Sequence, residues 1–345
     1  MEGRYLDLEI ELVDECIHSV SVVVPVFMGA ETLEQLASSV NRFTALSTTP
    51  LGLRFRVTEM VLVNDCGPDS SDDLIRGLAQ KYDFIAPVWL SRNFGQHAAT
   101  IAGMASTTAD WIATIDEDGQ HDPEFIGHML DKAVTSRSQL VYAAPAFGTS
   151  HGRFRNLTSM IAKRVASVIS SSEIPLIFSS FRLVSGEIGR SLAAYAGPSV
   201  YLDVALSWIV NHASVIKVPF GSEGRTSSGY SFRKLLGHFW RLALTAGTRP
   251  LRYVSIGGAL CAGMGLALAI RILVAKTVQG IDTAGWASVI VVVLILGGLT
   301  LFAVGIIAEY IGLVVRSTLG QPTYLVIRDP LKSPVFGFGS DNKEL

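Results

Sequence analysis

The chain has 345 residues, of which 49% are hydrophobic and 17% are charged, with 28 lysines and arginines against 30 aspartates and glutamates. Soluble domains carry about 25% charged residues, so this composition excludes a disordered chain and an ordinary cytosolic protein throughout its length. The formal net charge of −2 argues against a dedicated nucleic-acid binder, which would carry a strong basic excess.

Short β-rich runs alternate with helical patterns from about residue 18 to residue 145. The expected elements follow one another as a strand at 19–27, a helix at 32–43, a strand at 56–65, a helix at 71–82, a strand at 86–91, a helix at 96–107 and a strand at 109–116. This alternation predicts βαβ units and a mostly parallel sheet, whose ligands bind beyond the carboxyl ends of the strands. No glycine-rich dinucleotide fingerprint or P-loop follows a strand, so neither of those nucleotide folds is supported.

An acidic run, DEDGQHDPE at 116–124, directly follows the last of these strands. Asp116 and Asp118 are two positions apart where the chain leaves the sheet, so their carboxylates can converge. Hard divalent cations such as Mg²⁺ bind one or two carboxylates together with substrate phosphates. A bound cation would offset the charge of a nucleotide diphosphate and assist its departure. Taken alone, a D-x-D pair is a weak signal and is more often a turn or a helix cap than a functional site.

Two later stretches place apolar residues at helical spacing beside several arginines and lysines. Residues 230–247 predict an interfacial amphipathic helix that leads into a membrane. Residues 151–169 have a similar pattern, which fits either a second membrane-surface helix or a helix packed on the protein surface.

The apolar excess is concentrated near the C-terminus. Two segments, about 251–275 and 286–315, are long enough to cross a bilayer, which takes about 20 apolar residues. A polar, glycine-containing link separates them, so they predict a transmembrane hairpin. Basic residues precede the first segment and follow the second, and the positive-inside rule therefore places both flanking regions in the cytoplasm.

Six segments of the soluble part occur in a recognisable order: VVVPVFMGAETL, VLVNDCGPDSS, LSRNFGQHAA, TIDEDGQHDPE, FRL at 181–183 and GRTSSGYSFRKL. Together with the apolar tail they resemble the family 2 glycosyltransferases of GT-A fold, specifically the membrane-anchored, bacterial polyprenyl-phosphate glycosyltransferases of the dolichyl-phosphate-mannose-synthase type. The resemblance implies an α/β fold with a Rossmann-like, mostly parallel sheet. The expected organisation is a cytoplasmic GT-A domain at 1–228, an interfacial helix at 229–250, two transmembrane helices at 251–316 and a cytoplasmic tail at 317–345.

The resemblance also implies which residues contact the donor. The expected nucleotide contacts are Pro25, Phe27, Glu31, Asp65, Arg92, Asn93 and Asp116. The expected metal and diphosphate shell, with Mg²⁺ or Mn²⁺ as the cation, is Asp116, Asp118 and Gln120.

The acceptor side is expected to use basic and hydroxyl side chains, because a guanidinium binds phosphate in a bidentate fashion. The expected acceptor-phosphate contacts are Arg182, Arg225, Ser228, Tyr230, Ser231 and Lys234. The basic members of this set could instead meet anionic lipid headgroups. The expected catalytic residues are Asp118, Asp203 and Arg225, and Asp203 is equally compatible with a carboxylate at a helix start.

The expected reaction transfers a sugar from a nucleotide-diphosphate donor, with UDP favoured, to an undecaprenyl-type polyprenyl phosphate. The resemblance implies inversion at the anomeric carbon. A phosphate oxygen is already anionic near neutral pH, so a strong general base is less necessary than for a sugar hydroxyl. The enzyme is expected to be a multi-pass inner-membrane protein that forms homo-oligomers, with its catalytic domain in the cytoplasm and no nucleic-acid partner.

Two other functions fit parts of the pattern. A processive polysaccharide synthase uses the same domain but would normally carry more membrane spans and a QxxRW motif, neither of which is seen. A non-catalytic membrane scaffold that binds nucleotide sugars is the second alternative, and the intact D-x-D pair counts against it.

Overall fold

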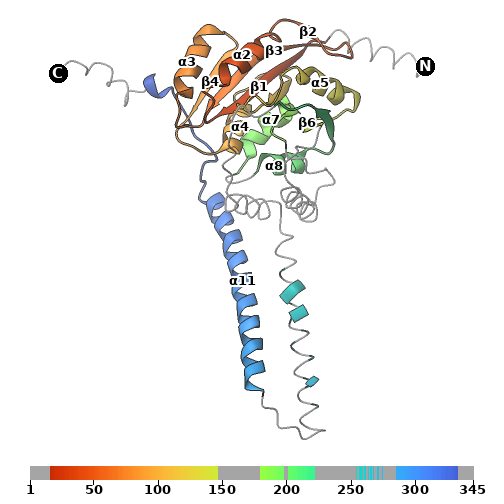
Figure 1. Cartoon of the computed structure of the whole chain (residues 1–345), viewed down its shortest axis with the longest axis vertical. Coiled ribbons are helices and arrows are strands. Elements are labelled where there is room, and N and C mark those ends of the chain that lie inside the picture. Colours follow the sequence, from red (N-terminus) through yellow and green to blue (C-terminus); the bar gives the residue numbers. More distant parts are fainter. Residues whose placement is uncertain are drawn as a thin grey trace, which may run out of the picture. The chain divides into compact units, whose positions relative to one another are not determined.

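A computed structural model describes residues 16–146, 179–197, 201–221 and 285–332, together with separate positions between 254 and 274 (Figure 1). The chain divides into two compact units. The first comprises 1–157, 172–230 and 322–345, and the second comprises 158–171 and 231–321. The predicted amphipathic stretches at 151–169 and 230–247 lie outside the described residues.

The first unit contains a sheet that has nine strands within the described residues, in the order β8-β6-β7-β5-β1-β3-β4-β9, with β2 paired to β3. The strands are β1 His18–Val26, β2 Ser47–Thr48, β3 Arg54–Asn64, β4 Ile85–Leu90, β5 Trp111–Thr114, β6 Leu140–Pro145, β7 Arg182–Ser185, β8 Ala213–Val218 and β9 Val326–Ile327. The four strands β5, β1, β3 and β4 are parallel to one another, which confirms the prediction for this part of the chain. Strand β7 is antiparallel to both of its neighbours, and β2 and β9 pair antiparallel with β3 and β4. The described sheet as a whole is therefore mixed, and the prediction of a mostly parallel sheet is correct only for its centre.

Six helices of the described residues accompany this sheet: α2 Leu33–Asn41, α3 Ser71–Lys81, α4 Gln96–Ala105, α5 Phe125–Thr135, α7 Gly186–Tyr195 and α8 Leu202–Ile209. Alternate residues of β1 pack against different helices, since successive side chains of a strand point to opposite faces. Val22 and Val24 belong to the core formed with α2, α3 and α5, whereas Val23 belongs to the core formed with α4, α7 and α8. Burial on both faces explains why β1 is a nearly continuous run of valines.

The loops beyond β1 and β3 approach each other closely. A Cβ atom on Gly67, which follows β3, would lie 1.5 Å from the carbonyl oxygen of Phe27, which follows β1. Only glycine fits at this contact. The two loops that end the central strands are thereby held together at the carboxyl edge of the sheet.

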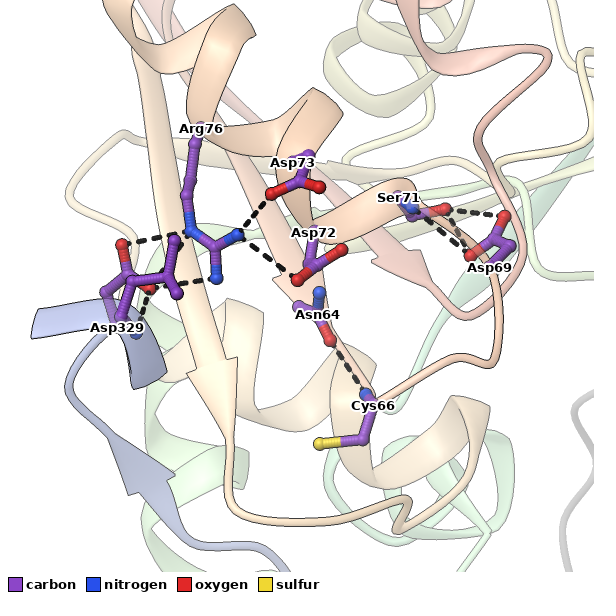
Figure 2. Close-up of polar contacts among 9 residues, drawn as sticks. Asn64, Cys66, Asp69, Ser71, Asp72, Asp73, Arg76 and Asp329 are labelled. Atoms are coloured by element: carbon purple, nitrogen blue, oxygen red, sulfur yellow. Dashed lines mark hydrogen bonds and ion pairs between the residues drawn. The ribbon is translucent and has the colours of Figure 1, made fainter. Parts of the chain in front are cut away.

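The chain also returns to the first unit near its C-terminal end. Strand β9 pairs antiparallel with β4, and the backbone N–H of Ser91 donates to the carbonyl oxygen of Leu325 at 3.0 Å. Asp329 lies just before the short 3₁₀ helix η1, Pro330–Lys332, and its carboxylate pairs with the guanidinium of Arg76 on α3 at 3.0 Å (Figure 2). The predicted tail therefore contributes a strand to the sheet, which the sequence pattern did not indicate.

The second unit contains α11, Trp286–Thr318, which has 33 residues and would be about 50 Å long at 1.5 Å per residue. Within the part of the chain that the structure describes, one helix is long and apolar enough to cross a membrane, through its window Ile295–Gly312. Only 6% of that window is buried.

This helix matches the second predicted span. The described positions of the first predicted span, 251–275, are scattered and helical. The described residues therefore contain one candidate membrane helix and do not show the predicted two-helix hairpin.

Candidate active site

A pocket of about 400 Å³ lies at the carboxyl edge of the parallel strands. It is lined by Pro25, Val26, Phe27, Asp65, Asn93, Gly95, Gln96, Asp116, Glu117 and Asp118. These residues come from the ends of β1, β3 and β5, from the loop between β4 and α4, and from the first residue of α4, because the carboxyl ends of parallel strands meet at one edge. We call this space the D-x-D pocket.

Asp65 follows β3, and its carboxylate is almost fully buried. One carboxylate oxygen accepts the backbone N–H of Phe94 at 2.7 Å and the other accepts that of Gly95 at 2.9 Å. Burial raises the pKa of Asp65, and these two hydrogen bonds oppose the shift. Asp65 therefore fixes the position of the loop that leads into α4, and both Asp65 and Gly95 of this loop line the pocket.

Asp116 and Asp118 both line the pocket, but they have different partners. Asp116 Oδ1 accepts the side-chain amide of Gln96 at 2.6 Å, and its Oδ2 accepts the hydroxyl of Ser180. Asp118 Oδ1 accepts the backbone N–H of Gln120 at 3.0 Å, which closes a turn through Gly119 at a left-handed φ of +77°. The first carboxylate is thus fixed by neighbouring elements, whereas the second belongs to a local turn.

Glu117, which lies between the two aspartates, connects this turn to β1. Its carboxylate accepts the backbone N–H of Phe27 at 2.8 Å and that of Met28 at 3.0 Å. Its carbonyl oxygen accepts the hydroxyl of Thr32. The sequence analysis did not predict a role for Glu117. A cation site needs only two of the three consecutive acids, so the third acid was a signal of a separate, structural role.

His121 is buried and contacts the backbone of the acidic turn. Its Nδ1 accepts the backbone N–H of Asp116 at 3.2 Å, and its ring stacks on Phe181 with centroids 5.1 Å apart. Burial lowers the pKa of His121. The imidazole is therefore neutral, with its proton on Nε2, and it supports the backbone of the acidic turn.

Arg182 on β7 and Asp203 on α8 form a buried ion pair, with Arg182 Nη1 2.7 Å from Asp203 Oδ1. The hydroxyl of Tyr142 on β6 donates to the same Asp203 oxygen at 2.9 Å. Burial raises the pKa of Asp203, and the charge of Arg182 opposes this. The sequence predicts an acceptor-phosphate contact for Arg182 and a catalytic role for Asp203, whereas the structure places the two side chains in contact.

The structure brings together most of the predicted donor-binding residues. Pro25, Phe27, Asp65, Asn93, Asp116 and Asp118 all line the D-x-D pocket. Glu31 and Arg92 are exposed and do not line it, and the guanidinium of Arg92 lies over the ring of Phe94 at 4.2 Å. Gln120 lies next to the pocket through its hydrogen bond to Asp118. The structure adds Val26, Gly95, Gln96 and Glu117 to the lining.

Several predicted acceptor residues lie outside the described residues: Arg225, Ser228, Tyr230, Ser231 and Lys234. Their roles stay predictions. Within the described residues, no group of three or more His, Cys, Asp or Glu side chains is arranged to hold a metal ion. A cation at Asp116 and Asp118 would therefore need further ligands from elsewhere.

Comparison with known proteins identifies the domain. The family model described as Glycosyl transferase family 2 matches residues 21–188. The chain is 28% identical over 312 residues to a bactoprenol glucosyl transferase of Shigella phage SfX, covering 89% of this chain and 98% of that protein. It is 29% identical over 328 residues to an undecaprenyl-phosphate 4-deoxy-4-formamido-L-arabinose transferase of Enterobacter sp. (strain 638), covering 91% and 94%.

The chain is also similar to a solved structure of glucosyl-3-phosphoglycerate synthase from Mycobacterium tuberculosis, determined in complex with Mn²⁺, UDP-glucose and phosphoglyceric acid. The TM-score is 0.47 and the sequence identity is 17%, and the alignment covers 66% of this chain and 78% of that chain. The family match begins within β1 and ends in α7, so it contains every described element that lines the D-x-D pocket. The chain therefore carries a glycosyl transferase family 2 domain, as its motifs predicted.

Proposed function

We propose that this chain transfers a sugar from a nucleotide-diphosphate donor to a polyprenyl phosphate of the undecaprenyl type, with inversion at the anomeric carbon. The observation that carries the proposal is that both D-x-D carboxylates line one pocket with Pro25, Phe27 and Asp65. Relatives named for bactoprenol and undecaprenyl-phosphate acceptors align over nearly their full length, which supports a lipid-phosphate acceptor.

The D-x-D pocket suits the nucleotide part of a donor. Its volume of about 400 Å³ falls in the range of small-molecule sites, which is about 300–1,000 Å³. The half-buried ring of Phe27 and the ring of Pro25 offer apolar surface to a base, while Asp65 and Asn93 supply polar atoms. We propose that UDP is the nucleotide.

A divalent cation, Mg²⁺ or Mn²⁺, follows from the charge of this pocket. Its described lining contains four acids, Asp65, Asp116, Glu117 and Asp118, and no lysine or arginine. An anionic diphosphate would be repelled unless a cation lay between it and the carboxylates. Carboxylate oxygens are the ligands that hard cations prefer, so the donor chemistry of Asp116 and Asp118 fits such an ion.

The remaining ligands of this cation would come from the donor phosphates and water, because Mg²⁺ is commonly bound by one or two carboxylates plus substrate oxygens. The cation and the nucleotide sugar are therefore expected to bind together. When bound, the cation stabilises charge on the departing diphosphate.

The reaction needs positioning more than a strong base. An acceptor phosphate oxygen attacks the anomeric carbon from the side opposite the leaving group, the bond from that carbon to the donor diphosphate breaks, and the nucleoside diphosphate departs with the electron pair. The attacking oxygen carries no proton that must be removed near neutral pH. Asp116 and Asp118 orient the donor, and the predicted basic residues Arg225 and Lys234 would hold the acceptor phosphate.

Helix α11 supplies a membrane anchor for this reaction. We propose that it pairs with a second span at 251–275 to form a hairpin, that the first unit faces the cytoplasm at the inner membrane, and that the protein forms homo-oligomers. A polyprenyl phosphate exposes its headgroup only at the membrane surface, so an anchored enzyme meets its acceptor at a high local concentration.

The decisive experiment incubates membranes that contain the full chain with undecaprenyl phosphate and a panel of nucleotide sugars, and measures lipid products by mass spectrometry. One added sugar per lipid is expected with at least one donor. A ladder of longer products would support a processive synthase instead. Binding of a nucleotide sugar without any product would support the non-catalytic scaffold.

A further inference from the structure

The chain that follows α11 is fixed to the first unit at both ends of a short stretch. We call this stretch, residues 323–329, the C-terminal segment. At its start, the hydroxyl of Thr323 donates to the carbonyl oxygen of Ala196, directly after α7, at 2.8 Å. At its end, the carboxylate of Asp329 pairs with the guanidinium of Arg76 on α3 at 3.0 Å. The segment and these partners belong to the same compact unit, although the segment follows the candidate membrane helix in sequence.

Between these two points, the segment lies beside the end of β4. Strand β9 pairs antiparallel with the last two residues of β4. The backbone N–H of Ser91, the next residue, donates to the carbonyl oxygen of Leu325 at 3.0 Å. Strand β9 is the outer neighbour of β4 in the described sheet, so without the segment this N–H would lose its partner.

The loop between β4 and α4, residues 91–95, supplies part of the D-x-D pocket. Asn93 and Gly95 of this loop line the pocket. The backbone N–H groups of Phe94 and Gly95 donate to the carboxylate of Asp65 at 2.7 and 2.9 Å. The β4–α4 loop is therefore bonded to the C-terminal segment at its first residue and to Asp65 at its last two.

Apolar packing connects the same segment and loop. Tyr324 of the C-terminal segment and Phe94 of the β4–α4 loop are both partly buried against the core that contains Val88 and Leu90 of β4. Aromatic side chains contribute large apolar areas, so the ring of Tyr324 adds to the attachment that the backbone bonds provide. Tyr324 and Leu325 do not line the D-x-D pocket, so they can affect a bound nucleotide only through the loop.

A loop that is fixed before a ligand arrives binds it more tightly than one that must be ordered on binding, because the ordering opposes association. Two of the five residues of the β4–α4 loop line the pocket, and its first residue depends on the C-terminal segment for a hydrogen bond. Detachment of the segment would therefore weaken nucleotide binding without changing any residue of the pocket.

We propose that the C-terminal segment positions the β4–α4 loop for nucleotide binding, so that the affinity for the donor depends on a strand made after the candidate membrane helix. This inference rests on the proposed function, and it deepens it by assigning control of donor binding to a part of the chain outside the pocket. Tyr324 and Leu325 are positioning residues in this arrangement. Only four residues separate the end of α11 from Thr323, so the donor site and the candidate membrane helix are joined by a short piece of chain.

The test places proline at two neighbouring positions of β9. Hydrogen-bonded and non-hydrogen-bonded pairs alternate along an antiparallel ladder. Because Ser91 bonds to Leu325, the register puts Ile327 at a hydrogen-bonded position and Val326 at a non-hydrogen-bonded one. Ile327→Pro therefore removes a ladder N–H, whereas Val326→Pro removes an N–H that points away from β4 and is the matched control.

A second pair of variants changes only side chains. Tyr324→Ala removes the ring that packs on the core beside β4. Tyr195→Ala, which removes a tyrosine that is 87% exposed at the end of α7, is its control. Each variant is the full chain in detergent. Calorimetry with UDP and with GDP, each with Mn²⁺, gives the Kd, and hydrogen exchange of a peptide that contains residues 91–95 measures the loop without nucleotide.

Ile327→Pro and Tyr324→Ala are each expected to raise the Kd for the nucleotide by about tenfold or more and to speed amide exchange in the β4–α4 loop. The two controls are expected to change the Kd by less than about twofold. Unfolded protein lowers the calorimetric stoichiometry and not the affinity of the folded molecules, so a purely structural role would leave the Kd unchanged. If thermal unfolding shows that Ile327→Pro does not fold, Tyr324→Ala decides.

An unchanged Kd in the folded variants would overturn the role of the segment in nucleotide binding, even with faster exchange in the loop. Equal effects of Ile327→Pro and Val326→Pro would overturn the attachment through the ladder. If the wild-type chain binds neither nucleotide, the proposed function itself fails, and the exchange rates alone then decide whether the segment fixes the loop.

Discussion

Asp116, Glu117 and Asp118 are consecutive acids whose carboxylates have different partners. Asp116 is fixed by side chains of Gln96 and Ser180, Glu117 accepts two backbone N–H groups after β1, and Asp118 accepts one within its own turn. Because Asp118 has the fewest constraints from other elements, its loss should affect cation binding with little effect on folding.

Asp118→Asn is therefore expected to reduce sugar transfer by about 100-fold or more, because a group that stabilises charge in the transition state is removed. Its unfolding temperature should stay close to that of the wild type. Activity is measured by lipid-product mass spectrometry and stability by thermal unfolding. Asp122→Asn, an exposed aspartate of the same loop, is the matched control and should keep its activity.

A chelator should abolish the same activity, and added Mg²⁺ or Mn²⁺ should restore it. Full turnover by Asp118→Asn, or full activity in excess EDTA, would contradict the cation proposal.

Sequence reasoning at the residue scale located the aspartates of the pocket because they stand directly after strands. Sequence reasoning could not assign a role to Glu117, because the carboxylate of Glu117 accepts hydrogen bonds from residues about 90 positions earlier. Local spacing carries no information about such distant contacts. The same limit applies to Arg182 and Asp203, which look like independent charged residues until β7 and α8 bring them into contact.

At the scale of elements, the D-x-D pocket depends on a tight contact between two loops. Gly67 has no room for a side chain, because the carbonyl oxygen of Phe27 occupies the space that a Cβ would need. Backbone atoms cannot move aside as a flexible side chain can, so a larger residue must displace one of the loops.

Gly67→Ala is expected to weaken nucleotide binding by about tenfold or more and to lower the unfolding temperature. Gly77→Ala is the matched control, since Gly77 is exposed on α3 with no atom within 4 Å of an added Cβ. Alanine favours a helix over glycine by about 0.8–1.0 kcal/mol, so this control should be slightly stabilising. Calorimetry with UDP and thermal unfolding measure both effects. Equal behaviour of the two variants would contradict the loop contact.

The second element-scale feature is the attachment of the C-terminal segment. The guanidinium of Arg76 pairs with Asp72, Asp73 and Asp329 (Figure 2). It also lies over the ring of Trp89, 4.7 Å from the ring centroid. The side chains of Arg76 and Asp329 are only 15% and 12% exposed, so solvent screens this pair less than a surface ion pair.

Asp329→Ala is expected to lower the free energy of unfolding by about 1.5–3 kcal/mol, the range for hydrogen bonds to charged groups. Glu34→Ala removes an exposed ion pair with Lys81 and should have no measurable effect. Denaturant unfolding of the full chain in detergent checks the difference. A loss no larger than that of Glu34→Ala would show that the C-terminal segment is not held by this pair.

The central parallel strands were predictable because each is a run of apolar residues buried on both faces. Strands β7 and β9 were not, since they have four and two residues and owe their position to pairing with distant strands. Short segments of this kind carry no periodicity from which a strand can be recognised.

At the scale of the whole molecule, α11 separates the parts of the chain that build the sheet. Large apolar side chains along it are exposed, among them Leu301 at 75% and Val304 at 54%. Exposed apolar surface of this length needs a nonaqueous environment, which a bilayer provides. Sequence hydropathy predicted this helix well because about 20 uncharged residues are a strong local signal.

The double variant Leu301→Arg/Val304→Arg should release the protein from the membrane or prevent its insertion, since an arginine at the centre of a spanning helix costs about 2.5–3.5 kcal/mol. Thr318→Arg, at the end of α11, is the control and should be retained. Extraction of membranes at alkaline pH, followed by detection of the chain in the pellet, measures retention. Equal retention of both proteins would argue against α11 as a membrane span.

The pairing of β9 with β4 also has a consequence for biosynthesis. A ribosome makes β4 first and β9 some 235 residues later, after all of α11 has been made. The edge strand of the catalytic sheet therefore stays open until the apolar helix has left the ribosome. A nascent chain released before β9 is made would contain the other eight strands of the described sheet and would leave β4 without its outer neighbour.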